Sequence, residues 1–216
     1  MKIIDLTQTI SSDMPVYPGT GQPLILQATS VEWEGFAEKL ITFYSHTGTH
    51  IDAPSHVLAG KKSLDKFEAD KFVGDAMVVD VSCCPGGVID EVFIAKYEEE
   101  LTQVDFLLFY SGWASKWGTE DYFKGFPVLT HEATIWLTQH RLKGVGFDSI
   151  SADSVSAQEL TNHKLFLGSN MIIIENLCNL DKLMGKIFTF ICLPLKIKDS
   201  DGSPARAVAM VKNHEN

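Results

Sequence analysis

The sequence predicts an α/β fold with a mixed, strand-rich arrangement, and three observations support this prediction. Short apolar runs at residues 75–81, 105–110 and 171–175 are typical of buried strands. Residues 90–100 and 130–140 have the apolar spacing of helices, and Thr130 is a suitable N-cap for the second one. The predicted strands and helices do not follow one another in strict βαβ order, which favours a mixed sheet.

The N-terminal part of the chain is predicted to consist of short strands separated by loops. Alternating apolar residues predict strands at 2–6, 24–28 and 37–44. Residues 11–21 contain several prolines and glycines and are expected to form a long ordered loop. Residues 46–58 are polar and contain Gly48 and Pro54, so we expect a second loop there.

The C-terminal part is predicted to be rich in strands as well. Strands are expected at 144–148, 188–196 and 205–211, a helix at 156–167 and a helical turn at 180–183. Asp201 and Gly202 form a dipeptide that is typical of hairpin turns. No repeat or low-complexity linker divides the chain, so residues 1–216 are expected to form a single domain.

Composition and charge restrict the class of protein. A formal net charge of −10 disfavours binding to nucleic acid or to an anionic membrane. The chain has no signal-peptide pattern and no apolar run long enough to span a membrane, so a cytoplasmic protein is expected. The four cysteines show no C-x-x-C spacing and are expected to be reduced. Any metal ligands are therefore sought among histidine, aspartate and glutamate.

The polar segment 46–56 holds the most informative group of residues, namely His46, His50, Asp52 and His56. In a fully extended chain His46 and His50 would lie roughly 13 Å apart, too far to share one ion easily. A regular helix would turn Asp52 away from His50, and Pro54 opposes a continuing helix. We therefore expect a tight turn at Gly48 that directs two imidazoles and a carboxylate to one point.

Neutral imidazoles combined with carboxylates suit zinc or manganese. An H-x-x-x-H pair alone occurs by chance, but Asp52 and His56 in the same segment strengthen the prediction of an open, catalytic metal site. Farther along, Glu175 ends the apolar strand at 171–175 and His163 precedes it. Such a glutamate either has a buried partner, such as a metal, or simply reaches solvent.

The segment H-T-G-T-H-I-D-A-P-S-H, residues 46–56, resembles the metal-binding motif of the cyclase-like metal-dependent hydrolases, a family that includes bacterial kynurenine formamidase (arylformamidase) and isatin hydrolase. Residues 5–7, 14–19 and 199–209 resemble other segments of this family in the same order. His163, followed twelve residues later by Glu175, is similar to its second metal-binding segment. The resemblance therefore covers nearly the whole chain.

This resemblance implies a fold of the swivelling β/β/α type and roles for individual residues. His46, His50 and Asp52 would bind a first ion, and Asp52 would bridge to a second. His163 and Glu175 would hold that second ion. The resemblance further implies His56 as the general acid/base, Tyr17 as a substrate-binding residue, two zinc ions or one manganese ion, and a homodimer or homotetramer.

The activity expected from the resemblance is hydrolysis of an amide, formamide or lactam by metal-activated water, with N-formylkynurenine as the first substrate. Residues 146–156 resemble the general branch of the family more than the formamidase branch, so an isatin-like cyclic amide or ester remains an alternative. A metal-binding protein without turnover and a cyclase in the literal sense are further alternatives. Trp113 and Trp117 are expected in the core rather than in a pocket wall, and Asp148 and Asp153 in turns and caps.

Overall fold

The computed structural model describes residues 1–84 and 87–212, and its centre is a sheet of eight strands. In spatial order these strands are β1 (Lys2–Asp5), β12 (Gly202–Val211), β11 (Phe188–Pro194), β5 (Val73–Asp80), β7 (Phe106–Tyr110), β9 (Gly144–Phe147), β10 (Ile172–Glu175) and β4 (His50–Asp52). Strand β4 also pairs with the long strand β12, so the sheet closes into a barrel-like ring with β1 outside it. The prediction of a mixed, strand-rich α/β fold is confirmed.

The strands of this sheet run in both directions. Strands β5, β7, β9 and β10 are parallel to one another, whereas β4, β11 and β12 pair antiparallel with their neighbours. The parallel strands are covered on both faces, which explains why they appear in the sequence as continuous apolar runs. In β7, for example, Phe106 and Leu108 belong to one apolar cluster and Leu107 and Phe109 to another.

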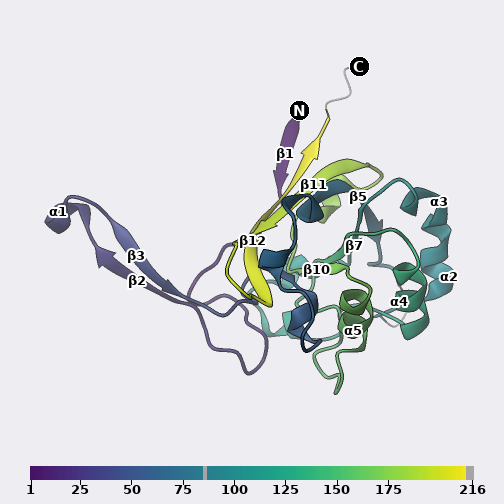
Figure 1. Cartoon of the computed structure of the whole chain (residues 1–216), viewed down its shortest axis with the longest axis horizontal. Helices are drawn as coiled ribbons and strands as arrows, with labels where there is room; N and C mark the ends of the chain where they lie inside the picture. The colour runs from purple at the N-terminus through teal and green to yellow at the C-terminus, as the bar shows by residue number, and fades with distance from the viewer. Residues whose placement is uncertain (85–86, 213–216) are drawn as a thin grey trace.

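Helices cover the outer face of the parallel strands (Figure 1). They are α2 (Glu91–Ile94), α3 (Glu98–Leu101), α4 (His131–Thr138) and α5 (Thr161–Gly168). Thr130 caps α4 as the sequence predicts, because it accepts a hydrogen bond from the backbone N–H of Ala133. Asp90 caps α2 in the same way, with a hydrogen bond from the backbone N–H of Phe93. In the described parts of the chain, no helix is long and apolar enough to cross a membrane.

Several short elements complete the described structure. Strands β6 (Val88–Ile89) and β8 (Val128–Leu129) pair in parallel. The 3-10 segments are η1 (Pro54–His56), η2 (Leu64–Lys66), η3 (Ala69–Phe72), η5 (Ala95–Tyr97), η6 (Trp113–Lys116), η7 (Glu120–Phe123) and η8 (Leu180–Leu183). The helical turn predicted at 180–183 is therefore present.

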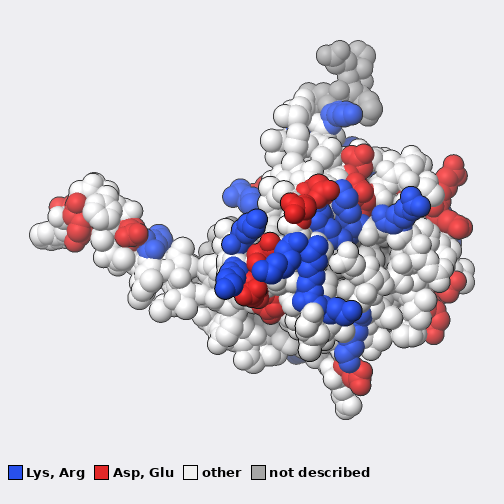
Figure 2. Space-filling model, viewed as in Figure 1, with Lys and Arg blue, Asp and Glu red and all other residues white. Residues whose placement is uncertain are grey.

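A two-stranded arm projects from the body (Figure 1). It consists of β2 (Leu24–Thr29), the short helix α1 (Val31–Glu34) and β3 (Glu38–Thr42), paired antiparallel. Its exposed apolar side chains are Leu24, Leu26, Val31, Trp33, Phe36, Leu40 and Ile41. Figure 2 shows that much of the arm surface is neither acidic nor basic. We will refer to residues 24–42 as the arm.

Three local predictions are wrong in their details. The predicted loop at 46–58 contains β4 and η1, because β10 and β12 pair with β4 from both sides and supply its backbone partners. The predicted helix at 156–167 begins only at Thr161, where Asp153 accepts hydrogen bonds from the first free N–H groups. Asp201 and Gly202 are not a two-residue turn: Gly202 already belongs to β12, and residues 195–201 connect it to β11.

Candidate metal centre

Strand β4 and the bend before it position the first group of predicted site residues. Gly48 has a positive φ of 63°, which places the bend where the sequence predicts a turn. His50 and Asp52 are two positions apart on β4 and therefore point to the same face, whereas Ile51 between them points into the apolar core. His46 Nδ1 reaches Asp52 Oδ1 at 2.6 Å, and His50 Nε2 lies 3.3 Å from the same oxygen.

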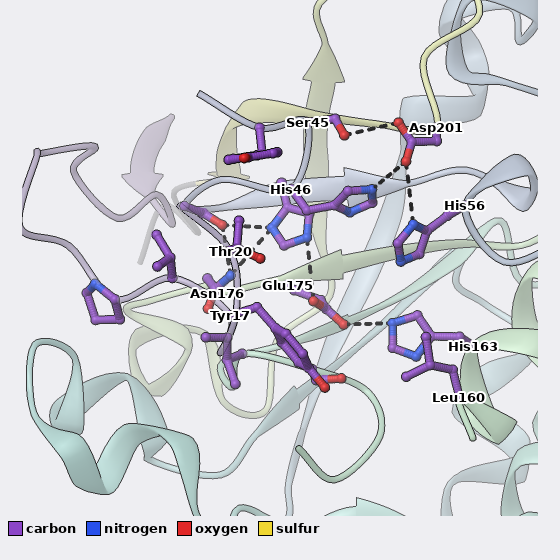
Figure 3. A pocket seen from close by; sticks show the side chains of 17 residues that line it. Tyr17, Thr20, Ser45, His46, His56, Leu160, His163, Glu175, Asn176 and Asp201 are labelled. Atoms are coloured by element: carbon purple, nitrogen blue, oxygen red, sulfur yellow. Dashed lines mark hydrogen bonds and ion pairs between the residues drawn. The ribbon is translucent and has the colours of Figure 1, made fainter. Parts of the chain in front are cut away.

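Strand pairing brings the distant residues to this point. Strand β10 lies antiparallel to β4 with Glu175 opposite His50, and Glu175 Oε2 is 3.5 Å from His50 Nε2. His163 extends from α5, with its Nε2 3.2 Å from Glu175 Oε1 and 3.6 Å from Asp52 Oδ2 (Figure 3). Glu175 is only 4% exposed, so the alternative that it reaches solvent is wrong.

Three groups of potential ligand atoms result, and within each group the ligand atoms lie within 4.8 Å of one another. Two of them share Asp52: one comprises His46, His50 and Asp52, and the other comprises Asp52, His163 and Glu175. The third comprises His46, His56 and Asp201 and lies at the rim of the same centre. All five residues that the sequence analysis expected as ligands are therefore adjacent in space.

Each histidine of the two groups that share Asp52 has one ring nitrogen fixed by a partner outside those two groups. His50 Nδ1 donates to the Gly48 carbonyl at 2.8 Å, and His163 Nδ1 donates to Asp153 Oδ2 at 2.6 Å. His46 Nε2 donates to a carboxylate as well, that of Asp201, at 3.1 Å. In all three rings the other nitrogen faces Asp52, the arrangement found for histidines that bind metals.

Asp52 provides the structural test of whether a metal fits. Its side chain is 1% exposed, and its Oδ2 has no hydrogen-bond partner in the described structure. A buried carboxylate oxygen without a partner is costly unless a cation compensates it. Imidazole and carboxylate donors without a thiolate are the set that zinc and manganese accept. The residues present thus fit a divalent ion.

The electrostatics of the centre show an excess of carboxylates. Burial lowers the pKa of His46, but the Asp52 and Asp201 carboxylates outweigh it and raise that pKa to about 10. Burial likewise opposes the charged form of His163, whose contacts with Asp153 and Glu175 raise its pKa to about 10. Without a metal, both rings are therefore protonated at neutral pH and balance the carboxylates with protons.

His56 lies beside the two ligand groups that share Asp52 and belongs instead to the third group, with His46 and Asp201. It sits at the end of η1, its ring centroid 3.9 Å from that of His46 and its Nδ1 3.6 Å from Asp201 Oδ2. Burial lowers the pKa of His56, and the positive charges of His46 and His163 lower it further. The carboxylates of Asp52 and Glu175 oppose this effect but do not outweigh it. At neutral pH His56 is consequently a neutral imidazole able to accept a proton.

A cavity of about 360 Å³ opens over these residues. Its apolar and aromatic walls are formed by Pro15, Val16, Tyr17, Tyr44, Ile150 and Leu160. Across residues 1–84 and 87–212, no lysine or arginine lines this cavity. Trp113 and Trp117 do not line it either: they pack, half-buried, in the aromatic cluster that also contains Tyr17.

The sequence analysis missed three residues at this site or gave them another role. Asp153 caps α5 as expected, because its carboxylate accepts hydrogen bonds from two backbone N–H groups of that helix. It also accepts a hydrogen bond from the His163 ring and so fixes the orientation of that ring. Asn176, with a positive φ of 59°, donates from its amide to the Gly48 carbonyl. Asp201 contacts both His46 and His56. Only contacts across the fold identify these three, so no local sequence pattern could have revealed them.

A family model described as putative cyclase matches residues 4–154, which is more than half of the chain. The chain belongs to this cyclase family. The match includes the segment 46–56 and ends before His163 and Glu175. The resemblance inferred from the sequence is thereby confirmed.

Members of the cyclase family and solved structures match nearly the entire chain. An uncharacterized protein of Methanocaldococcus jannaschii is 34% identical, over 98% of this chain and 100% of the relative. Kynurenine formamidase of Bacillus cereus is 31% identical, over 95% of each chain. The structure of isatin hydrolase A from Labrenzia aggregata superposes with a TM-score of 0.88 at 29% identity, over 97% of this chain and 93% of the other. The two relatives with a named activity are hydrolases, so hydrolysis is the family-level assignment.

Proposed function

We propose that this protein is a metal-dependent hydrolase that cleaves a carbon–nitrogen bond in a small amide, formamide or lactam. The main support is the pair of ligand groups that share buried Asp52, whose Oδ2 has no hydrogen-bond partner in the described structure, and whose three histidines and Glu175 line a cavity. In this proposal His46, His50 and Asp52 hold one ion, and Asp52, His163 and Glu175 hold a second one. Zinc is the first choice, and manganese is the alternative.

A divalent ion bound there would act as a Lewis acid, able to polarise the substrate carbonyl and to lower the pKa of a water molecule. The protein contributes the proton transfers and the positioning. His56, neutral and beside the ligand groups, accepts a proton from the attacking water and returns it to the leaving amine. Tyr17, Ile150 and Leu160 form walls against which a planar substrate packs and excludes bulk water.

N-formylkynurenine is the first substrate to test, because a kynurenine formamidase is among the relatives that match the whole chain. A specific observation favours isatin as the second candidate. The described cavity lining has no lysine or arginine to pair with the carboxylate of N-formylkynurenine, and isatin is uncharged.

The test is steady-state hydrolysis of both compounds by protein loaded with zinc or with manganese. We expect the protein to hydrolyse N-formylkynurenine to kynurenine and formate with a higher kcat/KM than it shows for isatin. A higher kcat/KM for isatin would assign the lactam as the substrate class. If the metal-loaded protein hydrolyses neither compound nor related amides and esters, a metal-binding protein without turnover replaces this proposal.

We further propose that two copies of this chain associate through the arm. An isolated two-stranded hairpin is only marginally stable in water, and both faces of this one expose apolar side chains. Trp33 near its tip is 86% exposed. Exposed apolar surface of this kind indicates an interface. A second copy suits it, because the arm leads through Tyr44 directly to the cavity.

Light scattering coupled to size-exclusion chromatography tests this association. The native chain should elute at twice 23.9 kDa or a higher even multiple. Leu26 and Leu40 face each other across the arm, so the double variant Leu26→Lys with Leu40→Glu keeps an attractive pair while removing apolar contact area. We expect this variant to be monomeric. Val92→Glu, which charges an exposed apolar residue on α2, is the control and should keep the native mass. A monomeric native chain would contradict the proposal.

A further inference from the structure

We propose that Asp201 is a positioning residue whose single carboxylate orients the His46 ring and faces His56, and that Gly202 beside it provides the space for the His46 ring. This inference rests on the proposed metal centre. It assigns a role in that centre to the segment that connects β11 to β12.

The carboxylate of Asp201 is placed between the two rings (Figure 3). Its Oδ2 accepts a hydrogen bond from His46 Nε2 at 3.1 Å and lies 3.6 Å from His56 Nδ1. Its other oxygen, Oδ1, accepts a hydrogen bond from the Ser45 hydroxyl at 3.0 Å. Both carboxylate oxygens thus have partners, and these fix the orientation of the group.

The backbone of Asp201 is tied to β4, the strand that carries the central ligands. The Asp201 carbonyl accepts a hydrogen bond from the Ala53 N–H at 2.8 Å, and Gly202 is opposite Asp52 in the pairing of β12 with β4. The position of the Asp201 carboxylate is therefore determined by the same strand register that positions Asp52.

Gly202 allows an unusually close approach of the His46 ring. A Cβ atom at Gly202 would lie 2.5 Å from His46 Cε1 and 2.7 Å from His46 Nε2. Real Cβ atoms do not come this close to other atoms, so any side chain at position 202 would displace the ring. The ring packs directly on the backbone of β12, next to the carboxylate that accepts its hydrogen bond.

These contacts determine which atom of His46 is available to a metal. When Nε2 donates to Asp201, the lone pair of Nδ1 is directed toward Asp52 and the ion site. A carboxylate behind a ligand histidine fixes the ring orientation and its tautomer, and losing such a partner typically costs about 10- to 100-fold in metal affinity or activity. His56 Nδ1 faces the same carboxylate at 3.6 Å, so Asp201 lies between the ligand and the proton carrier.

The test compares Asp201→Ala, Asp201→Asn and Gly202→Ala with the native protein. Three quantities are measured: the zinc dissociation constant, by competition with a chelator, and kcat and KM for the best substrate. Asp199→Asn is the matched control, because Asp199 lies in the same connection but is exposed and pairs with Lys66 at 3.3 Å. Thermal unfolding of the metal-free proteins verifies that each variant folds.

We expect Asp201→Ala and Gly202→Ala to weaken zinc binding about 10- to 100-fold and Asp201→Ala to lower kcat at least about tenfold, with KM nearly unchanged. Asp201→Asn, whose amide oxygen still accepts a hydrogen bond, should be intermediate, and Asp199→Asn should match the native protein. The inference is wrong if Asp201→Ala and Asp201→Asn keep both zinc affinity and kcat within about twofold of native values. Zinc affinity is independent of turnover, so the inference can be judged even if the proposed substrates fail.

Discussion

Replacing Asp52 with alanine should abolish metal binding at both halves of the centre and lower turnover by about three orders of magnitude or more. Asp52 joins the group of His46 and His50 to the group of His163 and Glu175, and it contacts His46 and His50 through one oxygen. Without it each group keeps only two potential ligands. The loss of a divalent ion removes several kcal/mol of transition-state stabilisation, and each 1.4 kcal/mol corresponds to about a tenfold change in rate.

Elemental analysis after zinc loading and gel filtration measures the first effect, and the initial rate of hydrolysis measures the second. Asp75→Asn is a suitable control, because Asp75 is an exposed carboxylate on β5 and lies outside both ligand groups. It should retain native metal content and rate. An Asp52→Ala protein that keeps its full metal content and turns over at the native rate would show that the ion binds elsewhere.

Replacing His56 with alanine should lower kcat by about two orders of magnitude or more while leaving the metal content unchanged. His56 borders the cavity without belonging to the two groups that contain Asp52, and its lowered pKa keeps it neutral at neutral pH. These properties suit a group that accepts and returns a proton. They also explain why the loss of His56 should affect the rate and spare the affinity for metal.

The control for His56 is His140→Ala. His140 lies just beyond the end of α4, where its Nδ1 donates to the Trp136 carbonyl, and it does not line the cavity. Its replacement should leave kcat unchanged. If His56→Ala is as active as the native enzyme, another group transfers the proton. If it loses its metal together with its activity, His56 is a ligand and not a proton carrier.

Residues that form a local motif were the part of the centre that the sequence could predict. His46, His50, Asp52 and His56 fall within eleven positions, and their donor chemistry indicates a divalent metal without any knowledge of the fold. The turn expected at Gly48 is present, with the positive φ that glycine permits. The sequence did not indicate that His50 and Asp52 lie on a strand, because β4 is a strand only through its pairing with β10 and β12.

The long-range part of the centre depended on resemblance instead. Spacing alone allows two predictions for Glu175, a buried metal ligand or a residue that reaches solvent. Its position opposite His50 in the sheet is what buries it. The dipeptide of Asp201 and Gly202 is typical of hairpins and predicts a tight turn. In the fold the connection is longer, and Asp201 faces the histidines. Local propensity cannot reveal a contact between segments that lie 155 residues apart.

The arm illustrates a similar limit in the fold. The alternation at 24–28 and 37–44 correctly predicted two strands, which the structure shows as β2 and β3. Alternation normally indicates one buried and one exposed face, but here both faces of the hairpin are exposed in the single chain. The sequence predicts the local conformation, whereas the position of the arm away from the body follows from packing.

Calorimetric titration of the metal-free protein with zinc and with manganese tests the central claim most directly. We predict saturable binding of one or two ions per chain, with proton release at neutral pH, because His46 and His163 are protonated there and must each free a nitrogen. Since their pKa values are raised to about 10, the apparent affinity should increase as the pH rises from 6 to 9. A protein that binds neither ion across this range would contradict the account.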